Sequence, residues 1–535
     1  MNQIVILSGK VGAGKTTLAH ELESGFGFCH VRTRDFLKTR WQELELERSA
    51  LQAFGEKLDR KTGGSWVVED LEGFARKSPQ VVKIVLDSVR HPGQIRALRE
   101  AYGPKVIHIH LEADLTELEA RYKRRASSEI KELPSYAMVQ QNKTEKTIDR
   151  LAKLADVVIR TDRCTPSDVL VRVASHIGCY GRECLRLVDV LVGGQYGSEG
   201  KGQVAAYLSG EYHYLIRVGG PNAGHKVKVG NSIFAFRHLP SGTLSSNAGL
   251  IIGAGAVLHV PTLLEEIAAC RVESDRLSID PQAMIISEED RANETTLRKN
   301  IGSTAQGVGF ATARRVTQRG LPDVKLARDV PELEPFIRET GRILDNAFSQ
   351  GKRVFLEGTQ GTGLSLYHGF YPHVTSRDTT VAGCLAEAGI SATRVRKAIM
   401  VCRTYPIRVM SPKGAGKTSG YMSKELEWSE IEERAGAPRD EFSSVEKGSV
   451  SLRLRRVAEF DWVLLRRAAS LNAPTDIALT FTDYISIKNR NARRFEQLTG
   501  PSIRFIEEVE KVAGAPVTLI STRFHSRGVI DRRAW

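Results

Sequence analysis

Two glycine-rich segments of this 535-residue sequence have the composition needed to hold phosphate groups. The first, GKVGAGKT at residues 9–16, matches the full P-loop pattern G-x-x-x-x-G-K-[ST] and lies between an apolar run at 4–8 and an amphipathic segment at 17–24. In such a loop the backbone amides hold the phosphates, Lys15 reaches the β- and γ-phosphate oxygens, and the Thr16 hydroxyl binds Mg²⁺. The predicted P-loop residues are Gly9, Gly12, Gly14, Lys15, Thr16 and Thr17.

The second segment, VDVLVGGQYGSEGKGQ at residues 188–203, is an apolar run that breaks into glycines before Lys201. A buried strand that leads into such a loop leaves room for backbone N–H groups to face an anion, and Lys201 adds a positive charge where a helix should begin. The segment does not match the Walker pattern, so on its own it is equally consistent with a plain glycine-rich turn. Its predicted phosphate-binding residues are Gly197, Glu199, Gly200, Lys201 and Gly202.

Polar and basic residues follow the strands expected in the first 180 residues. Asp87 and Arg90 come directly after the apolar run 81–86, and arginines end the expected helix 117–125. This region resembles small nucleoside-monophosphate kinases and relatives such as dephospho-CoA kinase. The resemblance implies that these groups order the metal's water, grip an acceptor phosphate and neutralise charge during transfer, although a solvated helical face explains the arginines equally well. The residues implied are Asp35, Asp87, Arg90, Arg121 and Arg125.

Residues 186–535 carry a series of motifs: QYGSEGKGQ (195–203), NAGH (222–225), GSTAQGVG (302–309), FLEGTQG (355–361), YPHVTSRDTT (371–380) and GSVSLRLRR (448–456). Each piece alone could be a glycine turn with polar caps. In this order they resemble the adenylosuccinate synthetases, which join aspartate to the 6-oxo position of a purine nucleotide by means of a nucleoside triphosphate. The resemblance implies a homodimeric ligase that uses Mg²⁺, a purine nucleoside monophosphate, L-aspartate, and ATP or GTP.

The same resemblance implies roles for single residues. His225 protonates or polarises the purine 6-oxygen, the Gly224 carbonyl binds Mg²⁺, and Lys201 and Gln360 belong to the catalytic set. Arginines suit the aspartate substrate because each gives two parallel N–H bonds to a carboxylate. An arginine lent by the neighbouring subunit falls on Gln318. The residues implied for the purine monophosphate are Asn222, Ser303, Thr304 and Thr375, and those for aspartate are Ser451, Arg453 and Arg455.

Three positions depart from the family pattern. Ser198 stands where the family has an aspartate that acts as base and helps to hold Mg²⁺, and Phe481 stands where a lysine joins Asp483 in reading guanine. Residues 523–525, RFH, replace Gly-Pro-Asp. A smaller residue at 198 leaves room for a 2-amino group, and the change resembles the phage branch that joins aspartate to dGMP. We therefore expect (d)GMP to be used at least as well as IMP and ATP to replace GTP, with an ordinary IMP-using enzyme as the alternative.

Positioning these motifs requires two α/β domains, because each glycine loop must follow a buried strand and open a helix. The alternation of apolar runs and amphipathic segments predicts doubly wound, P-loop-type domains: a small kinase-like domain at 1–180 and a larger ligase domain at 186–535. The length supports two separate cores. A short polar linker is expected at 178–186, and residues 477–482 are expected to form the last strand of the second sheet.

The remaining composition narrows the class of protein. The net charge is +14, but the basic residues are dispersed, so anionic small substrates explain the charge as well as nucleic acid does. We find no nucleic-acid recognition motif and no apolar run long enough to span a membrane, and expect neither partner. Seven scattered cysteines without zinc spacing indicate a reducing, cytoplasmic setting. A nucleotide-binding sensor with an inactive ligase is the rival function, and the retained His225, Gln360, Arg453 and Arg455 argue against it.

Overall fold

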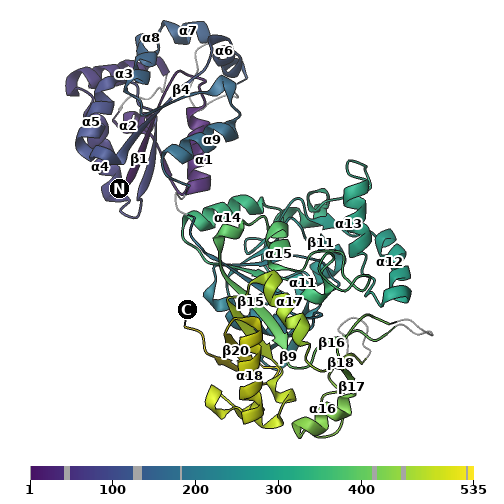
Figure 1. The fold of residues 1–535 in the computed structure, drawn as a ribbon. Helices are drawn as coiled ribbons and strands as arrows, with labels where there is room; N and C mark the ends of the chain where they lie inside the picture. The colour runs from purple at the N-terminus through teal and green to yellow at the C-terminus, as the bar shows by residue number, and fades with distance from the viewer. Residues whose placement is uncertain are drawn as a thin grey trace. The chain divides into compact units, whose positions relative to one another are not determined.

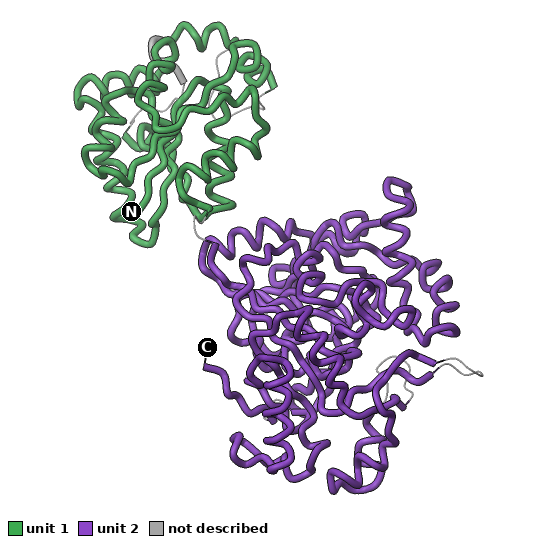
Figure 2. Tube along the Cα trace, in the orientation of Figure 1, with its two compact units in different colours: residues 1–182 green, residues 183–535 purple. Residues whose placement is uncertain are grey.

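The computed structural model describes residues 2–40, 48–124, 135–180, 184–411, 418–446, 454–525 and 528–534. The chain divides into two compact units, residues 1–182 and residues 183–535 (Figure 2). Each unit has its own sheet and its own buried apolar clusters. Within the described ranges, no helix combines the length and the apolar character that crossing a membrane requires.

A five-stranded parallel sheet forms the centre of the first unit, with strand order β2-β3-β1-β4-β5. Its central strand pairs on both sides, with Ile4 opposite Ile84 of one neighbour and Val106 of the other. A strand covered on both faces needs apolar side chains throughout, which explains the unbroken run IVIL in the first strand. The strands are β1 (Gln3–Ser8), β2 (Cys29–Arg32), β3 (Lys83–Asp87), β4 (Val106–Glu112) and β5 (Val157–Arg160).

Helices cover both faces of this sheet. They are α1 (Lys15–Phe26), α2 (Thr33–Arg40), α3 (Arg48–Thr62), α4 (Trp66–Lys77), α5 (Pro92–Tyr102), α6 (Leu115–Lys123), α7 (Tyr136–Gln141), α8 (Lys143–Thr147) and α9 (Pro166–His176). Val5 and Leu7 pack with α1 and α9, whereas Ile4 and Ile6 pack with α4 and α5. Figure 1 shows these two helix pairs on opposite sides of the sheet. The predicted doubly wound α/β fold is confirmed for this unit.

The second unit contains a nine-stranded sheet with order β12-β10-β7-β14-β6-β15-β19-β20-β21, parallel except at its last pair. Its strands are β6 (Val188–Gly193), β7 (Tyr214–Arg217), β10 (Gly249–Ile252), β12 (Leu277–Ile279), β14 (Val354–Glu357), β15 (Val395–Arg403), β19 (Asp476–Thr480), β20 (Val517–Ser521) and β21 (Val529–Asp531). The smaller pairings involve β8 (His225–Val229), β9 (Ser232–Phe236), β11 (Val257–Leu258), β13 (Met284–Ile285), β16 (Ile407–Arg408), β17 (Glu425–Leu426) and β18 (Arg456–Ala458). The prediction of 477–482 as the last strand was wrong, because β20 and β21 follow it.

Two apolar clusters lie on the two faces of this large sheet. One contains residues of α14, α15, α17 and α18, and the other contains residues of α10 and α11. The helices are α10 (Lys201–Leu208), α11 (Val260–Cys270), α12 (Glu288–Ile301), α13 (Val308–Thr317), α14 (Thr340–Ser349), α15 (Val381–Ala388), α16 (Trp428–Ala435), α17 (Trp462–Asn472) and α18 (Gly500–Ala513). The second unit is thus also α/β, as predicted.

The carboxyl ends of the neighbouring strands β7, β14, β6, β15 and β19 all point to one edge of the sheet. Three of the segments predicted to bind ligands, at 194–200, 218–224 and 358–361, are the loops that leave β6, β7 and β14 at that edge. Open parallel sheets bind their ligands at such an edge, in the crevice outside the strand ends. The fold therefore collects motifs that are far apart in the sequence.

Candidate functional site

The loop from residue 193 to residue 200 joins β6 to α10. Gly197 (φ 82°), Ser198 (φ 59°) and Gly200 (φ 89°) have the left-handed conformation. This conformation is routine for glycine but costs another residue on the order of 1–3 kcal/mol, so the surroundings must hold Ser198 in place. Arg403 Nη1 donates to the Ser198 carbonyl at 3.2 Å, and Ser198 is exposed while its neighbours Gly197 and Glu199 are buried. The loop therefore presents Ser198 outward at its crest.

A buried ion pair lies directly under this loop. Lys201 Nζ is 2.5 Å from Glu199 Oε2, and both side chains are almost fully buried. Glu199 Oε1 also accepts hydrogen bonds from the backbone N–H groups of Gly197 at 2.7 Å and Gln195 at 3.2 Å. The Glu199 side chain thus shapes the loop from within, and the Lys201 ammonium is held by this carboxylate.

His225 opens β8 and lies against the first turn of α10, where a Cβ on Gly202 would come within 2.8 Å of the His225 Cβ. Its Nδ1 is hydrogen-bonded to the Glu357 carboxylate and lies 3.3 Å from both Arg217 Nη1 and Ser241 Oγ. Burial, followed by the charge of Arg217, lowers the pKa of His225 to about 4, so the ring is neutral at pH 7. Since Glu357 accepts at Nδ1, that atom carries the proton, and Nε2 is the atom that can exchange one.

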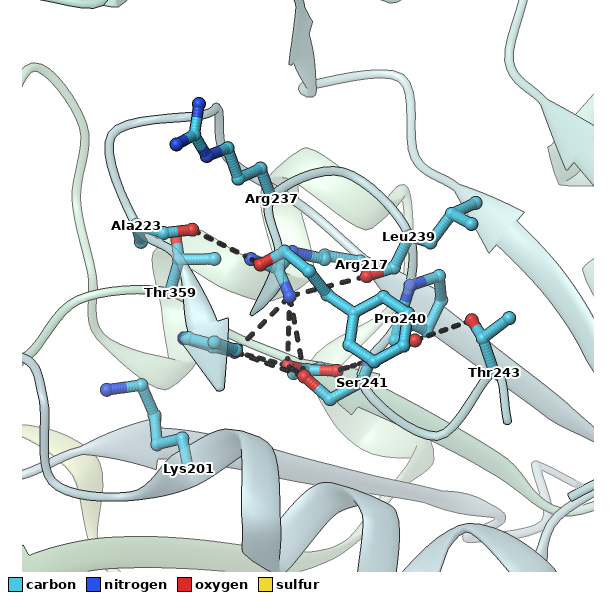
Figure 3. Close-up of polar contacts among 12 residues, drawn as sticks. Lys201, Arg217, Ala223, Arg237, Leu239, Pro240, Ser241, Thr243 and Thr359 are labelled. Atoms are coloured by element: carbon cyan, nitrogen blue, oxygen red, sulfur yellow. Dashed lines mark hydrogen bonds and ion pairs between the residues drawn. The ribbon is translucent and has the colours of Figure 1, made fainter. Parts of the chain in front are cut away.

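A buried ion pair supports His225 from two neighbouring strands. Arg217 ends β7 and Glu357 ends β14, with Nη1 3.2 Å from Oε1. Arg217 also donates to the Ala223 carbonyl at 3.0 Å, and the Ser241 backbone N–H donates to Glu357 at 2.7 Å. Figure 3 shows Arg217 in the middle of contacts to Ala223 and Ser241. Burial alone would raise the pKa of Glu357, but Arg217 and His225 outweigh it and lower the pKa to about 2.

Three charged residues of this site were not predicted from the sequence: Arg217, Glu357 and Arg403. Each is the last residue of an otherwise buried strand, β7, β14 or β15. A charge that ends an apolar strand is a usable signal, because a buried charge must be paired and therefore marks a place where strands meet a polar partner.

Side chains predicted to contact the purine monophosphate meet in pairs. Asn222 Oδ1 lies 3.1 Å from Thr304 Oγ1, so the loop after β7 touches the loop before α13. Gln360 Nε2 donates to Thr375 Oγ1 at 2.7 Å, which joins the loop after β14 to the segment before α15. Ser303 is half-buried in the same loop as Thr304. The structure thus brings these predicted residues together in two clusters of hydroxyl and amide groups.

Arg403 contacts both Ser198 in the glycine-rich loop and the aromatic ring of Phe481. Its guanidinium carbon lies 4.0 Å from the centre of the Phe481 ring, and its Nη2 donates to Glu446 at 2.6 Å. Phe481 itself is held in the left-handed conformation, with φ 59°. Two of the positions that depart from the family pattern, Ser198 and Phe481, therefore both contact one buried arginine.

Asp483 lies in the turn after β19 and has two carboxylate oxygens in different environments. Arg490 Nε donates to Oδ2 at 3.1 Å, whereas the buried Oδ1 has no hydrogen-bond partner in the described part of the chain. Burial, opposed by Arg490, raises the pKa of Asp483 to about 6. A buried acceptor without a donor is costly, and this makes Oδ1 a place where a ligand N–H can bind.

Some predicted residues lie where the structure gives no description. Ser451 and Arg453 of the aspartate motif and Arg125 of the kinase lid are outside the described residues. Arg455 is half-buried, and its backbone N–H donates to the Glu446 carbonyl at 3.2 Å. The aspartate motif therefore adjoins the Glu446 carboxylate that binds Arg403.

In the first unit a cleft of about 640 Å³ opens along the P-loop. Lys15 donates to the carbonyls of Gly9 at 2.7 Å and Lys10 at 2.8 Å, across the loop. Thr16 Oγ1 donates to Asp87 Oδ2 at 2.7 Å. Burial would raise the pKa of Asp87, but hydrogen bonding from His30 and the charge of Lys15 lower it to about 2, so this carboxylate is ionised. The strand–loop–helix arrangement predicted for the P-loop is present.

The other predicted kinase residues differ in their surroundings. Arg90 and Arg121 line the cleft, whereas Asp35 is not among the described residues that line it. Arg90 pairs with Glu145, which also accepts from the Val11 backbone N–H of the P-loop at 3.3 Å. A carboxylate thus bridges the P-loop and the arginine predicted to hold the acceptor phosphate.

Oxygen donors suited to Mg²⁺ are present in both units. In the first unit, the Thr16 hydroxyl and the ionised Asp87 carboxylate are 2.7 Å apart, which fits a hard cation that also binds nucleotide phosphates. In the second unit, the exposed Ser198 and the half-buried Gly224 offer neutral oxygens. These fit an ion that takes its remaining ligands from phosphates and water.

Comparison with known protein families gives matches to both units. The model of the adenylosuccinate synthetase family matches residues 190–330 and 324–490, and a model described as an AAA domain matches residues 5–149. Adenylosuccinate synthetase from Pyrococcus horikoshii is 37% identical over 352 residues, covering 64% of this chain and 98% of that protein. The enzyme of the same name from Methanocaldococcus jannaschii is 38% identical over 353 residues, covering 64% and 96%.

Two solved structures resemble the second unit. Adenylosuccinate synthetase from Plasmodium falciparum has a TM-score of 0.57 at 20% identity, covering 65% of this chain and 100% of its own, and shows the fold alone. Succinoaminodeoxyadenylate synthetase of cyanophage S-2L, bound to dGMP and to dATP as an energy donor, has a TM-score of 0.55 at 27% identity, covering 65% and 96%.

Proposed function

The chain belongs to the adenylosuccinate synthetase family, and from this membership we propose that its second unit joins L-aspartate to the 6-oxo position of a purine nucleoside monophosphate, with hydrolysis of a nucleoside triphosphate. The observation that carries the proposal is His225, which the buried Glu357 holds beside the first turn of α10, where Lys201 lies. A protein that only bound nucleotides would gain nothing from a histidine oriented in this way.

The reaction requires charge to be neutralised twice, first when the γ-phosphoryl group moves to the 6-oxygen and again when the aspartate amine displaces phosphate. Glu357 keeps the Nδ1 proton of His225 in place, so the neutral ring first takes up a second proton at Nε2 as the anionic substrates enter and favour its charged form, and it then passes that proton to the oxygen that gathers charge. Lys201 turns from Glu199 to the incoming phosphate. Mg²⁺, which Ser198 and Gly224 would help to hold, screens the phosphate oxygens when bound.

For the purine, we propose that Ser198 admits a 2-amino group, so that (d)GMP is used at least as well as IMP. Serine is neutral and far too weak a base to take the N1 proton unaided. Glu199, Glu357 and Glu446 are buried in ion pairs with Lys201, Arg217 and Arg403, so none of the three is a ready substitute. The dGMP bound to the cyanophage relative supports this proposal, and the archaeal relatives support ordinary adenylosuccinate synthesis as the alternative.

For the phosphate donor, we propose (d)ATP in place of GTP. A guanine base delivers two adjacent N–H donors and needs both oxygens of a carboxylate, whereas the adenine 6-amino group needs one. Asp483 offers Oδ1 without a competing donor, whereas Oδ2 already shares its lone pairs with Arg490. Phe481 supplies no polar contact beside it. The dATP bound to the cyanophage relative is consistent with this choice.

The remaining substrate contacts are proposals as well. The aspartate carboxylates would be held by Ser451, Arg453 and Arg455, of which Arg455 is described. We propose a homodimer, although Gln318 carries no charge and the nearby Arg315 donates to the Gln282 carbonyl of its own chain at 2.7 Å. Light scattering tests the dimer directly.

For the first unit, we propose transfer of the ATP γ-phosphoryl group to a small phosphorylated acceptor. Lys15, Thr16 and Asp87 are placed as the P-loop and its metal carboxylate, and Arg90 and Arg121 line the same cleft. The match to an AAA domain at residues 5–149 supports a nucleotide-binding P-loop, and the arginines support transfer.

A substrate matrix tests the ligase proposal. IMP, dIMP, GMP and dGMP are each combined with ATP or GTP, L-aspartate and Mg²⁺, and products are identified by mass spectrometry. We expect a 2-amino-succinoadenylate nucleotide from GMP or dGMP, and at least about a 10²-fold loss of turnover in His225→Ala. Ser198→Asp should shift the preference toward IMP. Turnover of IMP with none of GMP or dGMP refutes the 2-amino proposal, and binding without any product supports the sensor.

A further inference from the structure

The cleft of the first unit has walls of opposite charge. Lys15, Arg90 and Arg121 line it at the P-loop, where Asp87 is the carboxylate hydrogen-bonded to Thr16, and Glu56 and Asp59 line it from α3. Cations suit phosphate oxygens, whereas carboxylates repel them and attract N–H donors. The wall formed by α3 is therefore suited to the part of an acceptor that carries hydrogen-bond donors rather than phosphate.

The polar residues of α3 that line the cleft form one stripe. Gln52, Glu56 and Asp59 are spaced four and three residues apart, which places them on the same face of the helix. Leu51 and Gly55 line the cleft beside them and provide an apolar, uncrowded surface. A flat ring could lie on this surface with its polar edge toward the stripe.

Asp59 is the most constrained member of the stripe. It is 8% exposed, and its Oδ1 accepts from Trp66 Nε1 at 2.7 Å and from Gln94 Nε2 at 2.9 Å, while Gln94 Nε2 also lies 3.2 Å from Oδ2. Both donors are neutral, and an ionised carboxylate has lone pairs for about four hydrogen bonds, so the group can still accept from a ligand. Burial raises the pKa of Asp59, and a further donor would stabilise its ionised form.

A short chain of hydrogen bonds ties Asp59 to the backbone of Arg90, the arginine proposed to hold the acceptor phosphate. Gln94 donates to Asp59 through Nε2 and accepts from the Arg90 backbone N–H at 2.8 Å through Oε1. The separation between Asp59 and Arg90 is therefore fixed by bonded groups. This fixed separation would select a ligand that has hydrogen-bond donors at one end and a phosphate group at the other.

We propose that the acceptor of this unit is a purine (deoxy)nucleoside monophosphate with a 2-amino group, and that Asp59 and Glu56 read its base. The inference rests on the phosphotransfer proposed above. Guanine presents N1–H and the 2-amino group side by side, and because Asp59 Oδ1 already accepts from Trp66 and Gln94, one of these donors would bind Asp59 Oδ2 and the other Glu56. A 2,6-diaminopurine presents one amino group to each carboxylate. Thymine and hypoxanthine offer a single N–H next to a carbonyl oxygen, which a carboxylate repels.

The step itself balances without another reactant. The bond from the β-phosphate bridging oxygen to the γ-phosphorus of ATP breaks, and ADP leaves with the electron pair. A new bond joins the γ-phosphorus to an oxygen of the acceptor 5′-phosphate, which gives a nucleoside diphosphate. The substrates of both units would then share the 2-amino purine class.

The test uses the full chain without L-aspartate, so that the ligase cannot complete its reaction. Initial rates are measured with ATP, Mg²⁺ and dGMP, 2-amino-dAMP, dAMP, dIMP, dCMP or dTMP, and diphosphate products are identified by mass. We expect kcat/KM for dGMP or 2-amino-dAMP to exceed that for dIMP and dTMP at least about tenfold. Asp59→Asn should raise KM for dGMP about 10–100-fold with little change in kcat, which is the scale of one or two charge-assisted hydrogen bonds.

Two further variants keep the result interpretable. Glu56 is half-buried, so Glu56→Gln carries less risk of misfolding than Asp59→Asn, and it should reduce the preference for dGMP over dIMP. The control Glu72→Gln, exposed on α4, should leave this preference unchanged. Equal use of dIMP or dTMP, or an Asp59→Asn enzyme with unaltered preference, overturns the proposal. If no diphosphate forms from any acceptor, phosphotransfer is refuted. Recognition of the base by Asp59 is then tested by equilibrium binding, and it stands only if the wild-type protein binds dGMP at one more site than the Asp59→Asn variant does.

Discussion

Replacing Glu357 by glutamine keeps His225 in the protein while removing the group that holds it. The Glu357 carboxylate accepts from His225 Nδ1, Arg217 Nη1 and Ser241 Oγ through Oε1, and from the Ser241 backbone N–H through Oε2. A glutamine amide has one acceptor oxygen. Its NH₂ group must face either the Ser241 N–H or the three donors on the other side, so Glu357→Gln leaves donors unpaired in a buried site.

The expected magnitudes follow from these contacts. Breaking a buried ion pair from one side leaves Arg217 uncompensated and costs about 3–5 kcal/mol of unfolding free energy. Without the carboxylate, the His225 ring has no fixed tautomer or orientation, and the loss of a working general acid lowers kcat by about 10²–10⁴-fold. The KM for the purine should change much less, because Asn222 and Thr304, which are proposed to bind it, are held by a hydrogen bond to each other.

Urea unfolding and steady-state kinetics of Glu357→Gln measure both effects, with Asp189→Asn as the matched control. Asp189 is fully buried on β6 and accepts from Arg396 Nε at 2.9 Å and Tyr212 at 2.6 Å, among residues that the proposed reaction does not use. The control should lose comparable stability and keep most of its activity. A Glu357→Gln enzyme that is folded, binds the purine and keeps kcat within about threefold of wild type would refute the role given to the pair.

Three other predictions concern separate parts of the chain. Lys15→Ala should abolish phosphotransfer and leave ligase turnover intact, and Lys201→Ala should do the reverse; loss of ligase turnover in purified Lys15→Ala would show that the units are coupled. Asp483→Ala should raise the KM for ATP about tenfold or more in ligase assays, the scale of one hydrogen bond to a charged group, and an unchanged KM would remove it from the donor site. Burial, the largest cause for each, lowers the pKa of His108 and His110 to about 4 in the folded protein. As the pH falls below about 6.5, these histidines are protonated in the unfolded chain before they are protonated in the folded protein, which favours unfolding. The first unit should therefore lose stability between about pH 6.5 and 4, by up to about 1.4 kcal/mol per pH unit and histidine, and melting curves that stay unchanged down to pH 5 would contradict this.

Local patterns predicted much of the fold. Each glycine loop could be found because strand, loop and helix are contiguous, so the apolar run, the glycines and the lysine of residues 188–203 lie within sixteen positions. The apolar runs of β1 and β6 indicated strands covered on both faces, and the structure confirms α/β sheets with helices on each side. The strand β20 was overlooked, although its run VTLIS has the same character.

The pairing of the supporting charges of the site could not be derived in this way. Arg217 and Glu357 are 140 positions apart, and they meet because β7 and β14 are neighbours in the sheet, which follows from topology and not from local pattern. Glu199 was placed with the phosphate-binding residues from its position in the motif. In an irregular loop no period fixes the direction of a side chain, and in the structure this carboxylate lies under the loop with Lys201.

The order of strands in the second unit has a consequence for synthesis on the ribosome. The sheet of the first unit uses only residues 3–160, so all of its strands can pair before the second unit has been made. β6, which leads into the ligase loop, emerges soon afterward, but its two neighbours in the sheet are β14 and β15. The end of β15 is about 200 residues away, which at about 5–20 residues per second corresponds to some 10–40 s of translation. For most of that interval the apolar strand β6 cannot pair with either neighbour. The second unit is therefore the part of the nascent chain that would need chaperones most.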